Sequence, residues 1–214
     1  MHASGNARKV LDWSFARREK VLFFPDQHLG RNTGYNMGIP LEQMVLWDFA
    51  KPLGGLTIAQ IQQAKIILWS GTVCGVHQVF QPQDIDNFRK QYPSAQVIAH
   101  PECCFEVCQK ADAVGSTEFI IKTVRDSPPG TRWLVGTELN LVQRLAAEEL
   151  VNHKFVHYMS PYECMCSTMY RIDPQHLCWV LENLVAGHVV NAIQVADTEK
   201  VLARQALQAM LAIA

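Results

Sequence analysis

Short apolar runs alternate with amphipathic stretches along most of the chain. Runs rich in β-forming residues, each closed by proline, glycine or a polar residue, predict buried strands at residues 21–24, 66–69, 96–99, 113–114 and 133–135. Apolar residues at helical spacing predict helices at residues 57–65, 82–91, 117–124, 139–148 and 198–213. Thr57 is the expected cap of the first of these helices. Strand, loop and helix therefore follow one another at least four times.

This alternation predicts an α/β fold with parallel sheets and helices on both faces. The loops after the strands hold most of the unusual polar residues, and open α/β sheets carry their chemistry at that edge. Residues 34–62 are punctuated by glycine and proline, so we interpret them as an inserted loop ahead of the Thr57 helix. The loop at Asp26 is interpreted as structural, with Pro25 fixing the turn and Gly30 adopting an unusual backbone angle.

Composition and charge exclude several classes of protein. Hydrophobic residues make up 49% of the chain and charged residues 18%, which is typical of a packed globular protein. A net charge of −1 provides no basic field for nucleic acid or for an anionic membrane, and no apolar run approaches the ~20 residues of a membrane span. The first residues lack the apolar core of a secretory signal, so a cytoplasmic location is expected. There, seven cysteines indicate metal binding or chemistry rather than disulfides.

Six motifs occur in one order along the chain. Together they resemble the quinolinate synthase family, the A protein of bacterial NAD synthesis, and the resemblance runs from about Ser4 to the C-terminus. The motifs are residues 24–33, residues 69–77, His100-Pro101-Glu102, Gly115-Ser116-Thr117, Gly136-Thr137-Glu138 and Cys166-Ser167-Thr168-Met169.

The resemblance implies an architecture and an N-terminal truncation. Members of the family have three related, pseudo-symmetric, three-layer αβα domains with small parallel sheets, of which this chain is expected to hold the last two. We therefore expect a partial middle domain at residues 1–77, with the inserted loop at 34–62. A last α/β domain is expected at residues 78–165, and a C-terminal segment with terminal helices at 166–214.

The resemblance also implies an activity. Enzymes of the family condense iminoaspartate with dihydroxyacetone phosphate to give quinolinate in de novo NAD biosynthesis, which makes this chain a transferase by resemblance. They use a 4Fe-4S cluster held by three cysteines, and the fourth iron is left open to substrate oxygens as a Lewis acid. L-Aspartate oxidase is the implied metabolic partner. A chain that lacks the first cysteine ligand is expected to be inactive alone.

Site residues are carried over from the family motifs. Cys74 and Cys166 match the second and third cluster ligands, although Cys164, two residues away, remains an alternative to Cys166. Ser4 matches a serine that contacts substrate. The His-Pro-Glu motif makes Glu102 the expected general base and His100 a partner of a substrate oxygen. Thr117 opens a predicted helix, where backbone N–H groups and hydroxyls bind phosphate or carboxylate.

Plainer interpretations stand beside these. A lone cysteine is more often core than ligand, and this reading is preferred for Cys178 and for the group Cys103, Cys104 and Cys108. His28 and His77 are interpreted as loop or supporting residues rather than catalytic ones. A rival function is a noncatalytic module that binds a small dicarboxylate or phosphate near Glu102 and Thr117. A zinc hydrolase is a weaker third reading, because tight Cys-x-x-Cys or His-x-x-x-His spacing is absent from the sequence.

Overall fold

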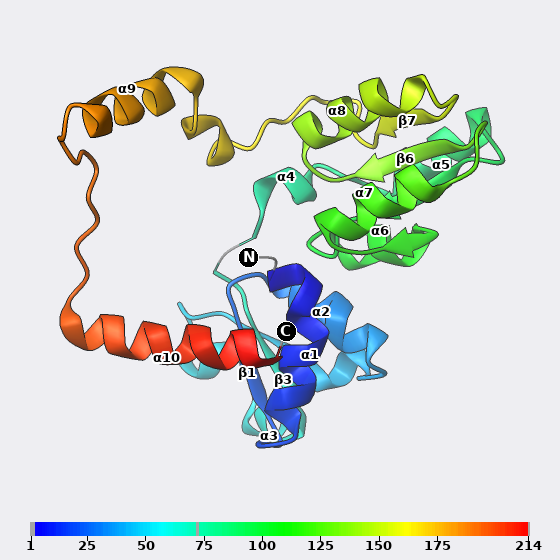
Figure 1. Cartoon of the computed structure of the whole chain (residues 1–214). Coiled ribbons are helices and arrows are strands. Elements are labelled where there is room, and N and C mark those ends of the chain that lie inside the picture. Colours follow the sequence, from blue (N-terminus) through cyan, green and yellow to red (C-terminus); the bar gives the residue numbers. More distant parts are fainter. Residues whose placement is uncertain (1–2, 72, 214) are drawn as a thin grey trace. The chain divides into compact units, whose positions relative to one another are not determined.

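The structure is a computed structural model that describes residues 3–71 and 73–213 (Figure 1). The chain divides into two compact units, Met1–Cys164 and Met165–Ala214. The first unit contains a three-stranded and a four-stranded sheet, and every strand pair in both is parallel. The predicted α/β fold with small parallel sheets is confirmed.

The three-stranded sheet has the order β1-β3-β2, with β1 (Val21–Phe23), β2 (Met44–Trp47) and β3 (Ile66–Trp69). Helices α1 (Ala3–Phe15) and α2 (Gln27–Asn36) contact its strands, and α3 (Ile58–Gln63) precedes β3. Thr57 caps α3 as predicted, because its hydroxyl accepts the N–H of Gln60. The core of this part is made of the buried residues Leu11, Ile39, Met44, Ile66 and Leu68.

Two predictions in this region are wrong. The segment expected to be a loop at residues 34–62 contains the edge strand β2, flanked by the 3₁₀ helices η1 (Leu41–Gln43) and η2 (Pro52–Gly55). The glycines and prolines belong to the turns around β2, whose strand conformation is stabilised by pairing with β3. Gly30 lies inside α2, where a Cβ would come within 2.6 Å of the Leu68 side chain. Close packing, and not an unusual backbone angle, therefore requires glycine there.

The four-stranded sheet has the order β5-β4-β6-β7. Its strands are β4 (Gln96–Ala99), β5 (Ala113–Val114), β6 (Arg132–Gly136) and β7 (Phe155–Tyr158). The helices of this part are α4 (Gly75–Gln78), α5 (Pro82–Gln91), α6 (Phe105–Lys110), α7 (Thr117–Asp126) and α8 (Leu139–Leu150). β3, β4 and β5 have the predicted bounds, whereas β7 and α6 were not predicted.

Successive residues of the central strands point to opposite faces of this sheet, as a pleated strand requires. Val97 of β4 packs in one core cluster with Ile85 of α5 and Val107 of α6. Ile98 packs in a second cluster with Ile120 of α7 and Leu145 of α8. Helices therefore cover both faces, which gives the three layers that were predicted.

The regular secondary structure of the second unit is helical over its described residues. It contains η3 (Met169–Arg171), α9 (Pro174–Val185) and α10 (Asp197–Ile213), of which α9 and α10 are drawn in orange and red in Figure 1. The predicted terminal helix at 198–213 is confirmed by α10. Asp173 caps α9 by accepting the N–H of His176 at 2.8 Å. Within the described part of the chain, every helix is too short or too polar to cross a membrane.

Candidate active site

Two loops bring the main polar residues together. The loop after β3 leads to Cys74, which is the residue before α4, and the loop after β4 begins with His100 and contains Glu102. His77 follows Cys74 by three residues, so the two side chains lie on the same side of this short helix. One ligand atom from each of Cys74, His77 and Glu102 lies within 4.8 Å of the others. Sulfur, nitrogen and oxygen donors thus converge between the two loops.

His77 is the central member of this group, and it is 7% exposed. Its Nδ1 atom lies 3.2 Å from Oε2 of Glu102, and its ring stacks on that of His100 with 4.5 Å between centroids. The contact with Glu102 is an ion-pair contact, because within the described residues neither ring nitrogen of His77 has a well-directed hydrogen bond. His77 was interpreted from the sequence as a loop or supporting residue, and its contact with both Cys74 and Glu102 was not predicted. Its spacing from Cys74 was the signal that could have indicated it.

The two stacked histidines have opposite electrostatic surroundings. Burial alone would lower the pKa of His77, but the Cys74 thiol and the Glu102 carboxylate outweigh burial and raise it to about 9. Burial, together with the neighbouring charge of His77, lowers the pKa of His100 to about 4. At neutral pH the site therefore holds a charged His77 against a neutral His100.

The ionisation of Cys74 and Glu102 follows from the same contacts. His77 lowers the pKa of the Cys74 thiol and also lowers the pKa of the Glu102 carboxyl, in each case as the largest favourable contact. The backbone N–H of Glu102 donates to Nδ1 of His100 at 3.3 Å, which leaves the proton of a neutral His100 on Nε2. The arrangement can bind a metal through a thiolate and can also accept or donate protons.

Comparison with known proteins decides the family. The family model described as "Quinolinate synthetase A protein" matches residues 1–212. The chain belongs to this family. Proteins named quinolinate synthase are 52% identical in Acidobacterium capsulatum, 51% in Rhodopirellula baltica and 50% in Corynebacterium glutamicum. Each match covers 98% of this chain and 56%, 53% and 52%, respectively, of the relative. The chain thus spans about half the length of the curated relatives it matches.

Two further residues carried over from the quinolinate synthase motifs lie on defined elements. Thr117 begins α7 directly after the cap Ser116, whose hydroxyl accepts the N–H of Phe119 at 3.4 Å. Because α7 follows β5, and β5 neighbours β4 in the sheet, Thr117 lies at the same strand edge as His100. Ser4 lies within α1, and its side chain is outside the described residues.

The quinolinate synthase motif at residues 166–169 lies in the second unit. Cys166 is half-buried, and the backbone N–H of Met169 donates to its Sγ at 3.5 Å. Such a donor suits a sulfur that carries negative charge. Cys164, the last residue of the first unit, is also half-buried, so the choice between these two cysteines stays open.

Cys103 in the loop after β4 and Cys108 in α6 fit packing and not metal binding. Cys103 and Cys108 are buried, and their Sγ atoms donate to the carbonyls of Gly136 and His100 at 3.5 and 3.7 Å. Burial raises the pKa of Cys103 well above its ordinary value and that of Cys108 to about 12. Cys178 was expected in a packed position, but it is exposed on α9.

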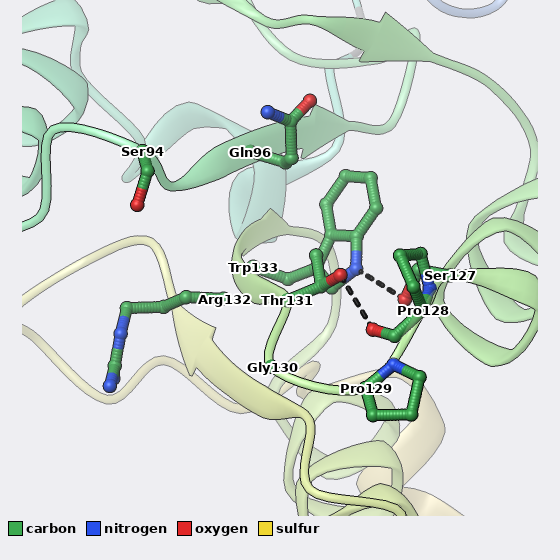
Figure 2. Close-up of a pocket in the computed structure, with 9 residues that line it drawn as sticks. All are labelled: Ser94, Gln96, Ser127, Pro128, Pro129, Gly130, Thr131, Arg132 and Trp133. Atoms are coloured by element: carbon green, nitrogen blue, oxygen red, sulfur yellow. Dashed lines mark hydrogen bonds between the residues drawn. The ribbon is translucent and has the colours of Figure 1, made fainter.

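A hollow of about 550 Å³ lies at the other end of the four-stranded sheet (Figure 2). It is lined by residues 127–133 together with Ser94 and Gln96, where β4 and β6 begin. Trp133 donates its indole N–H to the Ser127 hydroxyl at 3.1 Å, and the Thr131 hydroxyl donates to the Pro128 carbonyl at 2.7 Å (Figure 2). None of the family motifs contributes to this hollow, so the candidate site is the cluster at the carboxyl ends of the strands.

Proposed function

We propose that this chain contributes to quinolinate synthesis in de novo NAD biosynthesis, as a transferase that condenses iminoaspartate with dihydroxyacetone phosphate. The observation that carries the proposal is the convergence of Cys74, His77 and Glu102, with His100 stacked on His77, in a chain of this family. This convergence suits a reaction that needs a metal and repeated proton transfers. A cytoplasmic location and L-aspartate oxidase as the supplier of the imine belong to the same proposal.

Cys74 and Cys166 would hold a 4Fe-4S cluster, with a third cysteine from outside residues 1–214. Cys74 fits a ligand because it is half-buried and its pKa is lowered, and the thiolate is the form that binds iron. Cys166 fits because a backbone N–H points at its sulfur. When bound, the cluster would supply a Lewis acid for substrate oxygens.

The residues around His77 would carry out the proton transfers. Glu102 is ionised at neutral pH, because His77 lowers its pKa, so it can accept a proton from substrate as the general base. Neutral His100 carries its proton on Nε2 and can donate it in a hydrogen bond to a substrate oxygen. The imidazolium of His77 keeps Glu102 charged and limits the freedom of its carboxylate.

Thr117 and Ser4 complete the proposed substrate site. The hydroxyl and the backbone N–H of Thr117, at the start of α7, would bind the phosphate or a carboxylate of the substrates. Ser4 would contact substrate from α1. We further propose that residues 1–77 and 78–165 correspond to two related α/β domains, each with one of the two sheets, followed by the segment 166–214.

The decisive experiment compares this chain with a chimera. The chimera joins the chain to the part of the Acidobacterium capsulatum relative that lies outside the match. Both are reconstituted anaerobically with iron and sulfide, and quinolinate is measured by mass spectrometry. We expect product from the chimera and none from the chain alone. The Cys74→Ala and Cys166→Ala chimeras should lose both the product and the visible absorption of the cluster.

An alternative function is the noncatalytic module that binds a dicarboxylate or phosphate. A well-folded chimera that holds a cluster but forms no quinolinate would overturn the enzyme proposal. Binding of inorganic phosphate or of a dicarboxylate by the chain alone, lost in Thr117→Val, would then favour the module. The conservative variant Thr117→Ser keeps the hydroxyl and is expected to retain binding.

A further inference from the structure

Helix α2 carries two buried polar side chains that reach the two loops of the site. The first is Asp26, the cap of the helix, which is 6% exposed. One carboxylate oxygen accepts the N–H of Leu29 at 2.8 Å, and the other accepts the N–H of Cys74 at 3.2 Å. The second of these bonds joins residues 48 positions apart in the sequence. Asp26 therefore links the start of α2 to the backbone of the cysteine in the first loop.

Asn32 makes the corresponding link to the second loop. It is 2% exposed, and its side-chain NH₂ group donates to the carbonyls of Pro101 and Cys103 at 2.8 and 2.9 Å. These two carbonyls lie on either side of Glu102 in the sequence. An asparagine offers two N–H donors from one nitrogen, whereas aspartate and leucine offer none. The side chain thus holds the backbone on both sides of the proposed general base.

We propose that Asp26 and Asn32 are positioning residues. They hold Cys74 and Glu102 in fixed positions relative to each other, with α2 as the spacer between them. Both side chains contact backbone groups of the loops, and their importance for turnover rests on the proposed function. The spacer belongs to the three-stranded part, while Glu102 follows a strand of the four-stranded sheet. The site is therefore assembled from two sheets, and the hydrogen bonds of Asn32 join the loop after β4 to a helix of the three-stranded part.

The contacts around α2 support a rigid spacer. Tyr35 of α2 packs edge-on against Phe105 of α6, with 4.9 Å between ring centroids, so α2 is also held beyond the second loop. Asn32 keeps its Oδ1 atom without a hydrogen-bond partner among the described residues. An apolar side chain would avoid that cost, but it would leave the buried carbonyls of Pro101 and Cys103 without this donor. The two hydrogen bonds to the Glu102 loop therefore explain an amide at this position.

The test uses hydrogen exchange of individual backbone amides in the full chain. Asn32→Asp keeps the shape of the side chain but removes both donors, and Asp26→Asn places an NH₂ group beside one of the two N–H groups. We expect about tenfold faster exchange at Glu102 and Cys103 in Asn32→Asp, with Cys74 little changed. In Asp26→Asn we expect about tenfold faster exchange at Cys74, with Glu102 and Cys103 little changed.

Two controls separate positioning from general loss of stability. Asn36→Asp makes the same chemical change on the exposed end of α2 and should leave all three amides unchanged. Ile39→Ala opens the core of the three-stranded part without touching either loop, so it should accelerate exchange across that core. The proposal is overturned if Asn32→Asp leaves Glu102 and Cys103 protected, or if Ile39→Ala reproduces the same local pattern.

Turnover is measured separately in the chimera described above. There, Asn32→Asp is expected to lower kcat about tenfold with KM nearly unchanged, because the general base is displaced while the binding groups remain. A kcat equal to that of the unsubstituted chimera would overturn the positioning role in catalysis. An unsubstituted chimera without activity would count against the proposed function alone, since the exchange pattern would still decide whether α2 positions the loops.

Discussion

The imidazole rings of His77 and His100 stack with planes 11° apart and centroids 4.5 Å apart, although the two residues follow strands of different sheets. Two protonated rings at this distance would repel each other. The contact with Glu102 and Cys74 decides which ring carries the charge, because it favours protonation of His77 and thereby opposes protonation of His100.

This pair predicts two histidine titrations far from the ordinary range. In a pH titration of the ring C–H signals by NMR, His77 should lose its proton at about pH 9 and His100 at about pH 4. Glu102→Gln removes a carboxylate that favours the charged form of His77, so the pKa of His77 should fall. The ring signal of His153, which precedes β7 and so lies at the opposite end of the four-stranded sheet, should be unaffected by Glu102→Gln. An unchanged His77 titration in Glu102→Gln would contradict the assigned contact.

The cysteines should differ in reactivity in the order of their pKa values. His77 lowers the pKa of Cys74, whereas burial raises the pKa of Cys108 to about 12, and the thiolate is the reactive form. Brief alkylation with iodoacetamide at neutral pH, followed by peptide mass spectrometry, should modify Cys74 well before Cys108. His77→Ala should slow the modification of Cys74 and leave the exposed Cys178 unaffected. Equal rates at Cys74 with and without His77 would show that another group sets its reactivity.

Acid should weaken the fold partly through Glu149. Its carboxylate contacts Lys154 Nζ at 2.9 Å with both side chains 6% exposed, and Lys154 lowers its pKa. Because the folded pKa is below the ordinary value of 4.5, the stabilising contribution is present above that value and is lost as pH falls through the folded pKa. Glu149→Gln should lower the free energy of unfolding, measured with urea at neutral pH, by about 3 kcal/mol, since it leaves Lys154 without its charge partner.

The same variant should also flatten the acid dependence of stability, because glutamine does not titrate. Glu148→Gln is the matched control, since that carboxylate is 39% exposed and pairs with Arg125 at the surface. Glu148→Gln is expected to lower the free energy of unfolding by less than about 1 kcal/mol. An equal loss of unfolding free energy in the two variants would show that the buried pair stabilises the fold no more than the surface pair does.

Gly30→Ala should destabilise the three-stranded part by about 1–3 kcal/mol, as extra volume in a packed contact does. The new methyl group would lie 2.6 Å from Leu68 Cδ2 and 2.7 Å from the Phe23 ring. Gly75→Ala is the control, because nothing lies within 4 Å of a Cβ there. Urea unfolding of the two variants measures the difference. A Gly30→Ala protein as stable as Gly75→Ala would show that the contact relaxes.

Local pattern was sufficient for much of the first unit. The strand at 66–69 and the helix at 82–91 were predicted with their observed bounds, because apolar periodicity and the proline at the helix start act over a few residues. β2 was missed, since its four residues lie among glycines and prolines and become a strand through pairing with β3. The short segment at 155–158 likewise depends on its neighbour β6.

The sequence by itself determined the α/β class and, through the order of its motifs, a family to which the chain belongs. It also pointed to Cys74, His100 and Glu102, because polar residues after apolar strands mark the active edge of such sheets. Only the tertiary structure placed His77 between Cys74 and Glu102 and connected α2 to both loops. The physical reason is distance along the chain. Periodicity reports contacts between near neighbours, whereas these hydrogen bonds join residues 48 to 71 positions apart.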